Sequence, residues 1–174
     1  CLPDPSFFRF CEELLEKYRD DERIGQISGD NFQFGRRRSP DSYYFSHFNH
    51  IWGWASWRRA WKNYDVSLAA WPQARDAGWL QDILGVSHQA SYWTRVFQRV
   101  ANGEIDTWDY QWVFACWVNN ALTILPNVNL VSNIGFGPGA THTTRDNQFA
   151  NMGTEAMQFP LRHPGFVIRD TQAD

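Results

Sequence analysis

The chain is predicted to adopt an α/β fold. Apolar side chains repeat at helical spacing in three segments, residues 5–18, 82–100 and 110–119. Short apolar segments bounded by Gly or Pro are typical of strands, and they occur at residues 24–29, 123–125 and 128–134. Helices interleaved with strands indicate the α/β class. The length of 174 residues fits one domain with a core of its own.

The first helix and the first strand are the best-defined elements of the pattern. Asp4 followed by Pro5 is typical of a helix N-cap with proline at the first helical position. The strand at residues 24–29 is followed directly by Asp30 and Asn31. Open α/β sheets place ligand-binding groups at such strand ends, so both side chains are candidates for contacts with hydroxyl groups. The alternative is that they only shape a turn.

The middle of the chain is predicted to be a loop followed by helices. Residues 32–50 are polar, aromatic and irregular, which favours a loop over a cleft. Residues 54–64 are predicted to be helical after Gly53. In the helix at 82–100 the inner face is expected to carry the apolar residues Trp93, Val96, Phe97 and Val100.

The last third combines the two short strands with a glycine-rich loop and a polar tail. The loop covers residues 135–143, and its glycines permit close backbone approach to an anion. It is not a P-loop, because no Gly-Lys-Ser/Thr follows. The tail at 147–174 is polar and interrupted by proline, and it is expected to be extended on the surface.

Composition excludes several function classes. The net charge is −3, so general affinity for nucleic acid is not expected. Arg36, Arg37 and Arg38 form a local basic run, which is either a solvated loop or a phosphate contact. No apolar run approaches the length of a transmembrane helix. The three cysteines form no metal or disulfide pattern, which indicates reduced thiols and a cytoplasmic protein, or one attached peripherally to a membrane.

Ten tryptophans are the most informative feature of the composition. Most lie in two polar-aromatic stretches, residues 51–61 and 107–112. Flat rings beside carboxylates and amides suit a ligand with an apolar face and a hydroxyl-rich rim, which describes a sugar. For any single ring, a place in the core is the simpler interpretation, because aromatic side chains bury large areas.

Two residues are candidates for chemistry. Asp109 stands between Trp108 and Trp112, where it could accept a proton from a sugar hydroxyl. The alternative, which is compatible with the first, is an N-cap for the following helix. His142 lies in the glycine-rich loop, where it could contact a metal ion or pyrophosphate or be an idle surface side chain.

Five stretches together resemble the C-terminal half of GT-A glycosyltransferases. They are residues 3–10, 27–31, 53–58, 108–109 and 135–142. The closest likeness is to family 2-like bacterial enzymes, including cyanobacterial proteins labelled HlpA-like. The layout is also similar to that of N-acetylglucosaminyltransferase I. The resemblance implies the acceptor-side part of a mixed sheet flanked by helices. The resemblance covers residues 1 to about 145 and rests on the order and spacing of the motifs.

The resemblance implies a role for each matched residue. Trp108 would pack on the donor sugar, and Asp109 would be the catalytic base of an inverting reaction. Gly53 and Trp54 would form the floor of the donor-sugar site, and Asp30 and Asn31 would contact the sugar or the acceptor. In the loop over the diphosphate, the implied contacts are Gly137, Gly139 and Thr141, with His142 near metal or phosphate.

The resemblance also implies partners that this chain does not supply. The donor would be a nucleotide sugar and the acceptor a carbohydrate or glycan hydroxyl. A divalent metal, Mn²⁺ or Mg²⁺, would be held mainly by an acidic motif upstream of Cys1, in a nucleotide-binding half that is missing here. Residues 1–146 would then be the acceptor and donor-sugar half, followed by the tail at 147–174. Because the chain opens at Cys1 without an initiator Met, we expect a fragment that is inactive alone.

Two other functions fit the same residues. The chain could be a non-catalytic carbohydrate-binding module that uses tryptophan platforms. It could also be a degenerate transferase that is kept as a structural partner.

Overall fold

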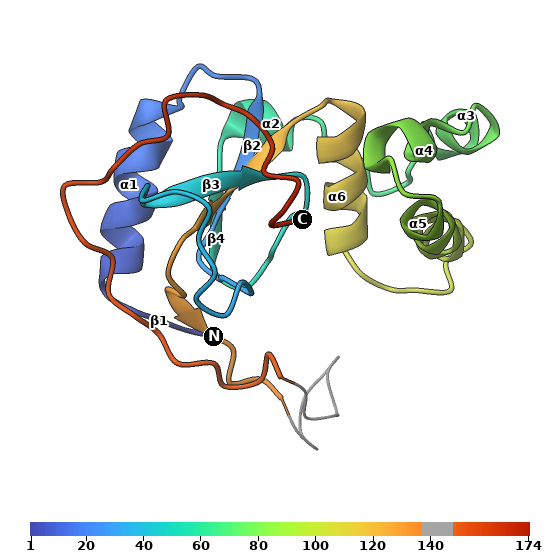
Figure 1. Ribbon diagram of the computed structural model, residues 1–174. Helices are drawn as coiled ribbons and strands as arrows, with labels where there is room; N and C mark the ends of the chain where they lie inside the picture. Colours follow the sequence, from blue (N-terminus) through green and yellow to red (C-terminus); the bar gives the residue numbers. More distant parts are fainter. Residues whose placement is uncertain (137–147) are drawn as a thin grey trace. The chain divides into compact units, whose positions relative to one another are not determined.

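A computed structural model describes residues 1–136 and 148–174 (Figure 1). It divides into two compact units. Unit 1 comprises Cys1–Ala60 and Ala121–Asp174, and unit 2 comprises Trp61–Asn120. Strands and helices occur together, with a four-stranded mixed sheet and a two-stranded sheet, so the predicted α/β class is confirmed.

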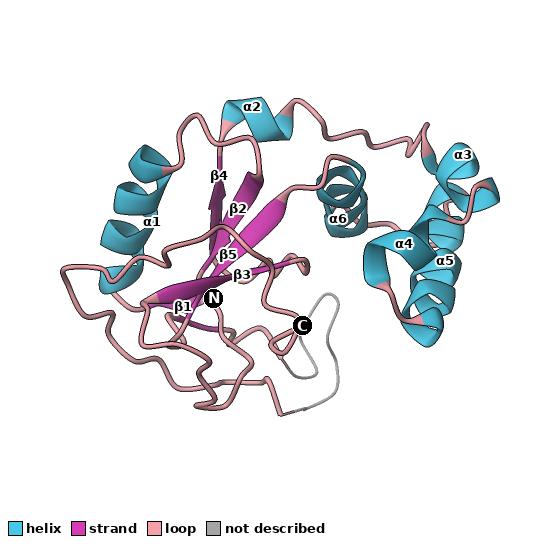
Figure 2. Cartoon of the chain, turned by 45° about the horizontal axis from the view of Figure 1, so that its top comes forward, coloured by secondary structure: helices cyan, strands magenta, loops and turns pink. Residues whose placement is uncertain are grey.

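A four-stranded sheet forms the centre of unit 1 (Figure 2). Its strands are β2 (Ile24–Ser28), β3 (Tyr43–Ser46), β4 (Trp54–Ser56) and β5 (Leu122–Pro126). The spatial order is β3-β5-β2-β4, with β2 parallel to β5 and the other neighbours antiparallel. Every residue of β2 is buried, and the strand lies in the interior of the sheet. The predicted strands at 24–29 and 123–125 are therefore confirmed.

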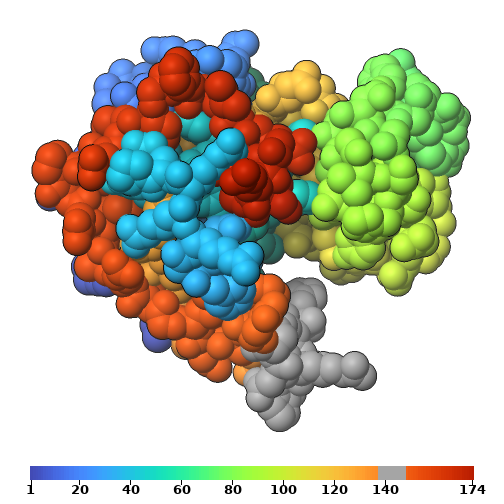
Figure 3. All heavy atoms as spheres, viewed as in Figure 1, coloured from blue at the N-terminus to red at the C-terminus, as the bar shows by residue number. Residues whose placement is uncertain are grey.

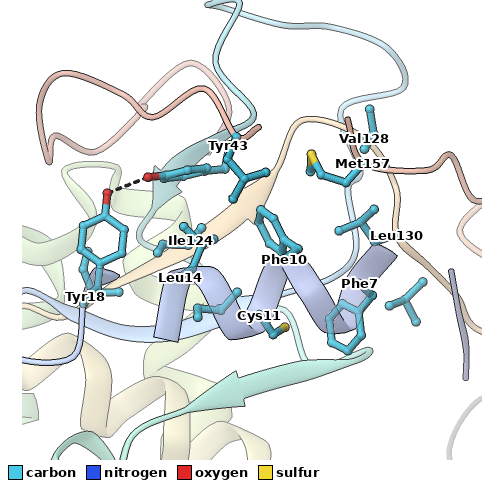
Figure 4. Packing of buried hydrophobic residues seen from close by; sticks show 14 of the residues in the cluster. Phe7, Phe10, Cys11, Leu14, Tyr18, Tyr43, Ile124, Val128, Leu130 and Met157 are labelled. Carbon is cyan, nitrogen blue, oxygen red and sulfur yellow. Dashed lines mark hydrogen bonds between the residues drawn. The ribbon is translucent and has the colours of Figure 1, made fainter. Parts of the chain in front are cut away.

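Helix α1 (Ser6–Lys17) supplies one side of the main core (Figure 4). Phe7, Phe10 and Leu14 are buried in a cluster that also contains residues of β2, β3 and β5. The Asp4 carboxylate accepts a hydrogen bond from the Ser6 N–H at 2.8 Å. The predicted N-cap position is wrong by one residue, because Pro5 occupies the N-cap and Ser6 is the first helical residue.

The C-terminal residues belong to unit 1. Strand β1 (Leu2–Pro3) pairs antiparallel with β6 (Val131–Ser132). Residues 148–174 form no helix or named strand, yet Met157 and Leu161 are buried in the main core. A bridge joins Phe45 of β3 to Arg169. The predicted boundary at residue 146 lies outside the described residues.

Unit 2 is helical. Most of its length lies in α3 (Trp71–Asp76), α4 (Trp79–Leu84), α5 (Ser87–Ala101) and α6 (Asp109–Val118). Trp71, Phe97 and Phe114 pack mutually, with ring centroids 5.2 to 5.9 Å apart. All residues from 111 to 117 are buried, as expected for a helix that is apolar on nearly every side. The helix predicted at 110–119 is confirmed.

Several predicted elements are wrong in type or extent. The helix predicted at 54–64 is instead strand β4 followed by the short helix α2 (Arg58–Trp61). Aromatic residues suit either class, and pairing of β4 with β2 decides in favour of the strand. The loop predicted at 32–50 contains β3, and the strand predicted at 128–134 shortens to β6.

The helix predicted at 82–100 is two helices. Gly85 has φ +71° and ends α4, and α5 starts two residues later. Of the predicted inner face, Val96, Phe97 and Val100 are buried and Trp93 is half-buried. Within the described residues, no helix is long and apolar enough to cross a membrane.

Candidate functional site

Four aromatic side chains of unit 2 form a cluster, here called the aromatic platform: Trp61, Tyr64, Trp108 and Trp112. The rings of Trp61 and Tyr64 are stacked, with centroids 4.5 Å apart and planes 6° apart. Trp61 also contacts Trp112 at 5.0 Å and Trp108 at 6.4 Å. Trp112 is buried and anchors the platform, whereas Trp61 is 41 % exposed and Trp108 is 40 % exposed. The platform therefore offers ring surface to solvent on a fixed base.

Asp109 is the carboxylate of this platform. It is the first residue of α6 and is half-buried. Its Oδ1 accepts hydrogen bonds from the Tyr110 N–H at 3.1 Å and from the Thr107 hydroxyl. The pKa of Tyr64 is raised, mainly by burial and next by the negative charge of Asp109. A negative charge in the first turn of a helix interacts favourably with the helix dipole, and a carboxylate is a common proton acceptor in catalysis.

The predicted N-cap role of Asp109 is wrong. Trp108 occupies the N-cap position, and it makes no capping hydrogen bond with its side chain. Asp109 lies one residue later, inside the helix, where its carboxylate bonds the adjacent N–H rather than the N–H groups that a cap satisfies.

Unit 1 holds a second polar cluster, centred on Asp30. This residue follows β2 as predicted and is 1 % exposed. Its Oδ1 lies 2.7 Å from His50 Nδ1 and accepts a hydrogen bond from Ser28 Oγ at 3.1 Å. Its Oδ2 has no hydrogen-bond partner within residues 1–136 and 148–174. A buried oxygen left in this state is costly, so it marks a place where a donor from outside would be stabilised.

The imidazole of His50 is held by a ring against one face and by Asp30 at its Nδ1. Phe32 stacks on it with centroids 4.7 Å apart, and Trp52 meets Phe32 edge-on at 5.1 Å. Ser28 Oγ also lies 2.9 Å from the His50 carbonyl oxygen, so its one proton is shared between this oxygen and Asp30 Oδ1. An aspartate on Nδ1 favours the tautomer in which Nε2 is the basic nitrogen, the arrangement of a proton-transfer pair.

Asn31 is occupied within the fold. Its Nδ2 donates to the Pro126 carbonyl at 2.6 Å, and its Oδ1 accepts from the Gln33 N–H at 2.8 Å. Its own N–H donates to Asn129 Oδ1 at 3.1 Å. These bonds tie the segment after β2 to the end of β5, and thereby fix the position of Asp30.

Gly53 and Trp54 lie at the start of β4. Gly53 has φ +68°, and a Cβ built on it would lie 2.6 Å from Val131 Cγ2. The position therefore requires glycine for both conformation and packing. Trp54 pairs with Ser28 in the sheet and lines an open groove of about 610 Å³ along α1, together with Phe7 and Leu15.

The predicted site residues thus fall into separate groups. Trp108 and Asp109 are adjacent in unit 2, while Asp30, Asn31, Gly53 and Trp54 belong to unit 1. Gly137, Gly139, Thr141 and His142 lie outside the described residues. Among the residues that are described, no group of three or more His, Cys, Asp or Glu could hold a metal ion.

Sequence reasoning missed His50 as a partner of Asp30. His50 entered the prediction only as the last residue of the loop expected at 32–50. The one available signal was a histidine in an aromatic loop that follows a strand ending in aspartate. That signal does not specify a contact between residues 20 positions apart.

Comparison of the chain with protein-family models, curated proteins and solved structures gives no match.

Proposed function

We propose that this chain is the acceptor-side half of an inverting GT-A type glycosyltransferase. Its reaction is the transfer of a sugar from a nucleotide-sugar donor to a carbohydrate hydroxyl. The observation that carries the proposal is the position of Asp109, a half-buried carboxylate at the start of α6 beside the aromatic platform. The mixed sheet of unit 1, with Asp30 at the end of β2, agrees with the same class of fold.

The platform and the carboxylate have complementary tasks in this reaction. The apolar face of a pyranose ring stacks on Trp108 and Trp61, whose rings are large, flat and partly exposed. Asp109 accepts the proton of the acceptor hydroxyl. The acceptor oxygen forms its bond to the anomeric carbon while the bond from that carbon to the diphosphate oxygen breaks. The electron pair leaves with the diphosphate, and the configuration at the anomeric carbon is inverted.

The remaining parts of the enzyme are assigned by resemblance. By that resemblance, the nucleotide-binding half and the main carboxylate ligands of a divalent Mn²⁺ or Mg²⁺ ion would lie upstream of Cys1. The ion would neutralise charge on the leaving diphosphate. Donor-sugar contacts of Gly53 and Trp54, and diphosphate contacts of the loop that contains His142, stay predictions.

One observation favours a second candidate, a non-catalytic carbohydrate-binding module. The rings of Trp61 and Tyr64 are nearly parallel and stacked, and such a rigid pair can bind a sugar without any reaction. The two candidates agree on the aromatic platform and differ on Asp109.

The test separates binding from turnover. We expect Asp109→Asn in the full-length gene product to lower the rate of nucleoside diphosphate release by about 10²- to 10⁴-fold, because the general base is lost. Release would be measured with a panel of nucleotide sugars and Mn²⁺. The matched control is Asp106→Asn, which changes an exposed carboxylate three residues earlier and should leave the rate unchanged.

Binding is measured on the same proteins by NMR titration with monosaccharides. Trp108→Ala should weaken binding about fivefold, since an aromatic contact contributes about 1 kcal/mol. Trp79→Ala removes another exposed tryptophan of unit 2, outside the platform, and should have no effect. Full turnover by the Asp109→Asn protein would refute the catalytic role. Sugar binding that depends on Trp108, without turnover of any donor, would favour the binding module.

A further inference from the structure

A cavity on unit 1 collects the three consecutive arginines of the chain. It has a volume of about 240 Å³ and lies between the segment before β3 and the C-terminal residues. Figure 3 shows these two segments side by side, blue to cyan against dark red. The lining comprises Gln33, Arg36, Arg37, Arg38, Tyr44, Asn127, Asp170, Gln172 and Ala173.

The charges of this cavity are unbalanced. Three guanidinium groups face one carboxylate, that of Asp170, and the protein as a whole is negative. Asp170 is already neutralised, because its Oδ1 accepts from Arg38 Nη1 at 2.9 Å and from the Gln172 N–H at 3.1 Å. A positive cavity on a negative protein selects an anion.

Two arginines remain for a ligand. The guanidinium of Arg36 has no ion pair within residues 1–136 and 148–174. Arg37 lies 3.8 Å from Glu155, and both side chains are about half-exposed or more, so this pair contributes little. Guanidinium groups bind phosphate oxygens through pairs of parallel hydrogen bonds, which makes arginine the preferred residue for such groups.

Tyr44 provides an independent sign of a missing ligand. It is 8 % exposed and lines the cavity, where its hydroxyl lies beside the Gln33 amide. Among the described residues no acceptor takes the proton of this hydroxyl, and the neighbouring Gln33 amide, which lowers the pKa, acts toward it as a donor. Burial raises the pKa of Tyr44 well above its usual value, so the group stays protonated and can donate. A buried hydroxyl whose proton has no acceptor is destabilising unless something enters to accept its hydrogen bond.

The volume of the cavity and its other lining residues limit the kinds of ligand that it can bind. Pockets for drug-sized ligands begin at about 300 Å³, so this cavity suits one anionic group with a short polar substituent. The amides of Asn127 and Gln172 line it as well and can bond hydroxyl groups.

We propose that this cavity binds the phosphomonoester group of a small hydroxylated molecule, held by Arg36, Arg37 and Tyr44. The cavity belongs to unit 1, whereas the aromatic platform belongs to unit 2. It does not depend on the proposed glycosyl transfer, because none of its residues has a part in that reaction.

Calorimetric titration of the whole chain with glycerol 3-phosphate tests the proposal, with inorganic phosphate, glycerol and sulfate as comparison ligands. We expect both phosphates to bind, glycerol 3-phosphate more tightly, and glycerol alone not to bind. Arg36→Gln and Arg37→Gln should each weaken binding about tenfold, the usual effect of losing a hydrogen bond to a charged group. Arg95→Gln, an exposed arginine of α5 in unit 2, is the matched control and should bind as the parent chain does.

Tyr44→Phe distinguishes a ligand contact from a structural role. Removal of this hydroxyl should weaken glycerol 3-phosphate binding severalfold while the urea midpoint stays the same or rises. Equal affinities for phosphate in the Arg36→Gln, Arg37→Gln and Arg95→Gln proteins would overturn the proposal. Binding to vesicles that contain phosphatidic acid, without binding of glycerol 3-phosphate, would overturn the assignment to a small molecule.

Discussion

His47 is the residue whose burial has the clearest consequence for stability. It is 8 % exposed, and burial lowers the pKa of its imidazole to about 4, with a further lowering by the charge of Arg169. The charge of Asp174 acts in the opposite direction. In the unfolded chain the pKa returns to about 6.5. The unfolded state therefore binds more protons than the folded state between pH 6.5 and 4, so stability falls as the pH is lowered through this range.

We expect the free energy of unfolding to fall by about 2 kcal/mol between pH 7 and pH 4.5 because of His47 alone. Urea unfolding at a series of pH values measures the slope. His47→Gln should remove most of the decrease, since glutamine takes up no proton. His88→Gln changes an exposed histidine of α5 and should preserve it. Equal slopes in the parent and the His47→Gln protein would contradict the assignment.

At this scale the sequence predicted positions better than contacts. The position of Asp30 at the end of β2 could be predicted, because a short apolar strand bounded by glycine is recognisable from neighbouring residues alone. Its pairing with His50 depends on the path of the chain between residues 31 and 49, which no spacing rule specifies. The burial of Tyr44 beside the arginines could not be predicted either, because its strand β3 was expected to be part of a loop.

At the scale of elements, the success of each prediction follows from periodicity. Helix α1 has one apolar face and α6 is almost wholly apolar, so both were recognisable. Strands β3 and β4 are only four and three residues long. Their aromatic residues carry no clear period, and pairing with β5 and β2 establishes them as strands.

Gly53 shows how a single position fixes the start of β4. Gly53 itself has φ +68°, a conformation that glycine adopts readily, and the chain enters β4 directly after it. Val131 of β6 occupies the space that a Cβ at position 53 would need. We expect Gly53→Ala to destabilise the protein by about 3 kcal/mol, from the left-handed conformation and the overpacking together. Thermal or urea unfolding measures the loss.

Gly78→Ala is the control that isolates the backbone cost. Gly78 has φ +73°, but nothing lies within 4 Å of the position that a Cβ would take there. Its replacement should cost about 1 kcal/mol, the penalty for the left-handed conformation alone. If the two variants lose equal stability, close packing against Val131 is not what restricts position 53.

At the scale of the whole molecule, each unit has a core of its own. The core of unit 1 combines α1 with the mixed sheet, while that of unit 2 is built from aromatic residues of its helices. Unit 2 is formed by one continuous segment, whereas unit 1 is formed by two. Separate cores permit separate opening, because local stability follows the contacts within each cooperative region.

We expect Ile27→Val to lower hydrogen-exchange protection in unit 1 and to leave unit 2 largely unchanged. Phe97→Leu should do the reverse. Each substitution removes about 1 kcal/mol of packing at a fully buried position. Exchange measured by mass spectrometry on peptides from each unit gives the result. A uniform loss of protection across both units, in both variants, would mean that the protein unfolds as one cooperative body.

The positions of the three cysteines allow the opening of each unit to be measured in the unmodified chain. Cys11 is buried in unit 1 and Cys116 in unit 2, while Cys1 is exposed. Burial raises the pKa of Cys11 to about 12, so its thiol is nearly unreactive while α1 is packed. An alkylating reagent therefore modifies Cys1 at once and reaches each of the other two sulfurs only when the surrounding helix departs from its core. The order in which Cys11 and Cys116 are modified therefore shows which unit opens first, and one sample is enough to measure it.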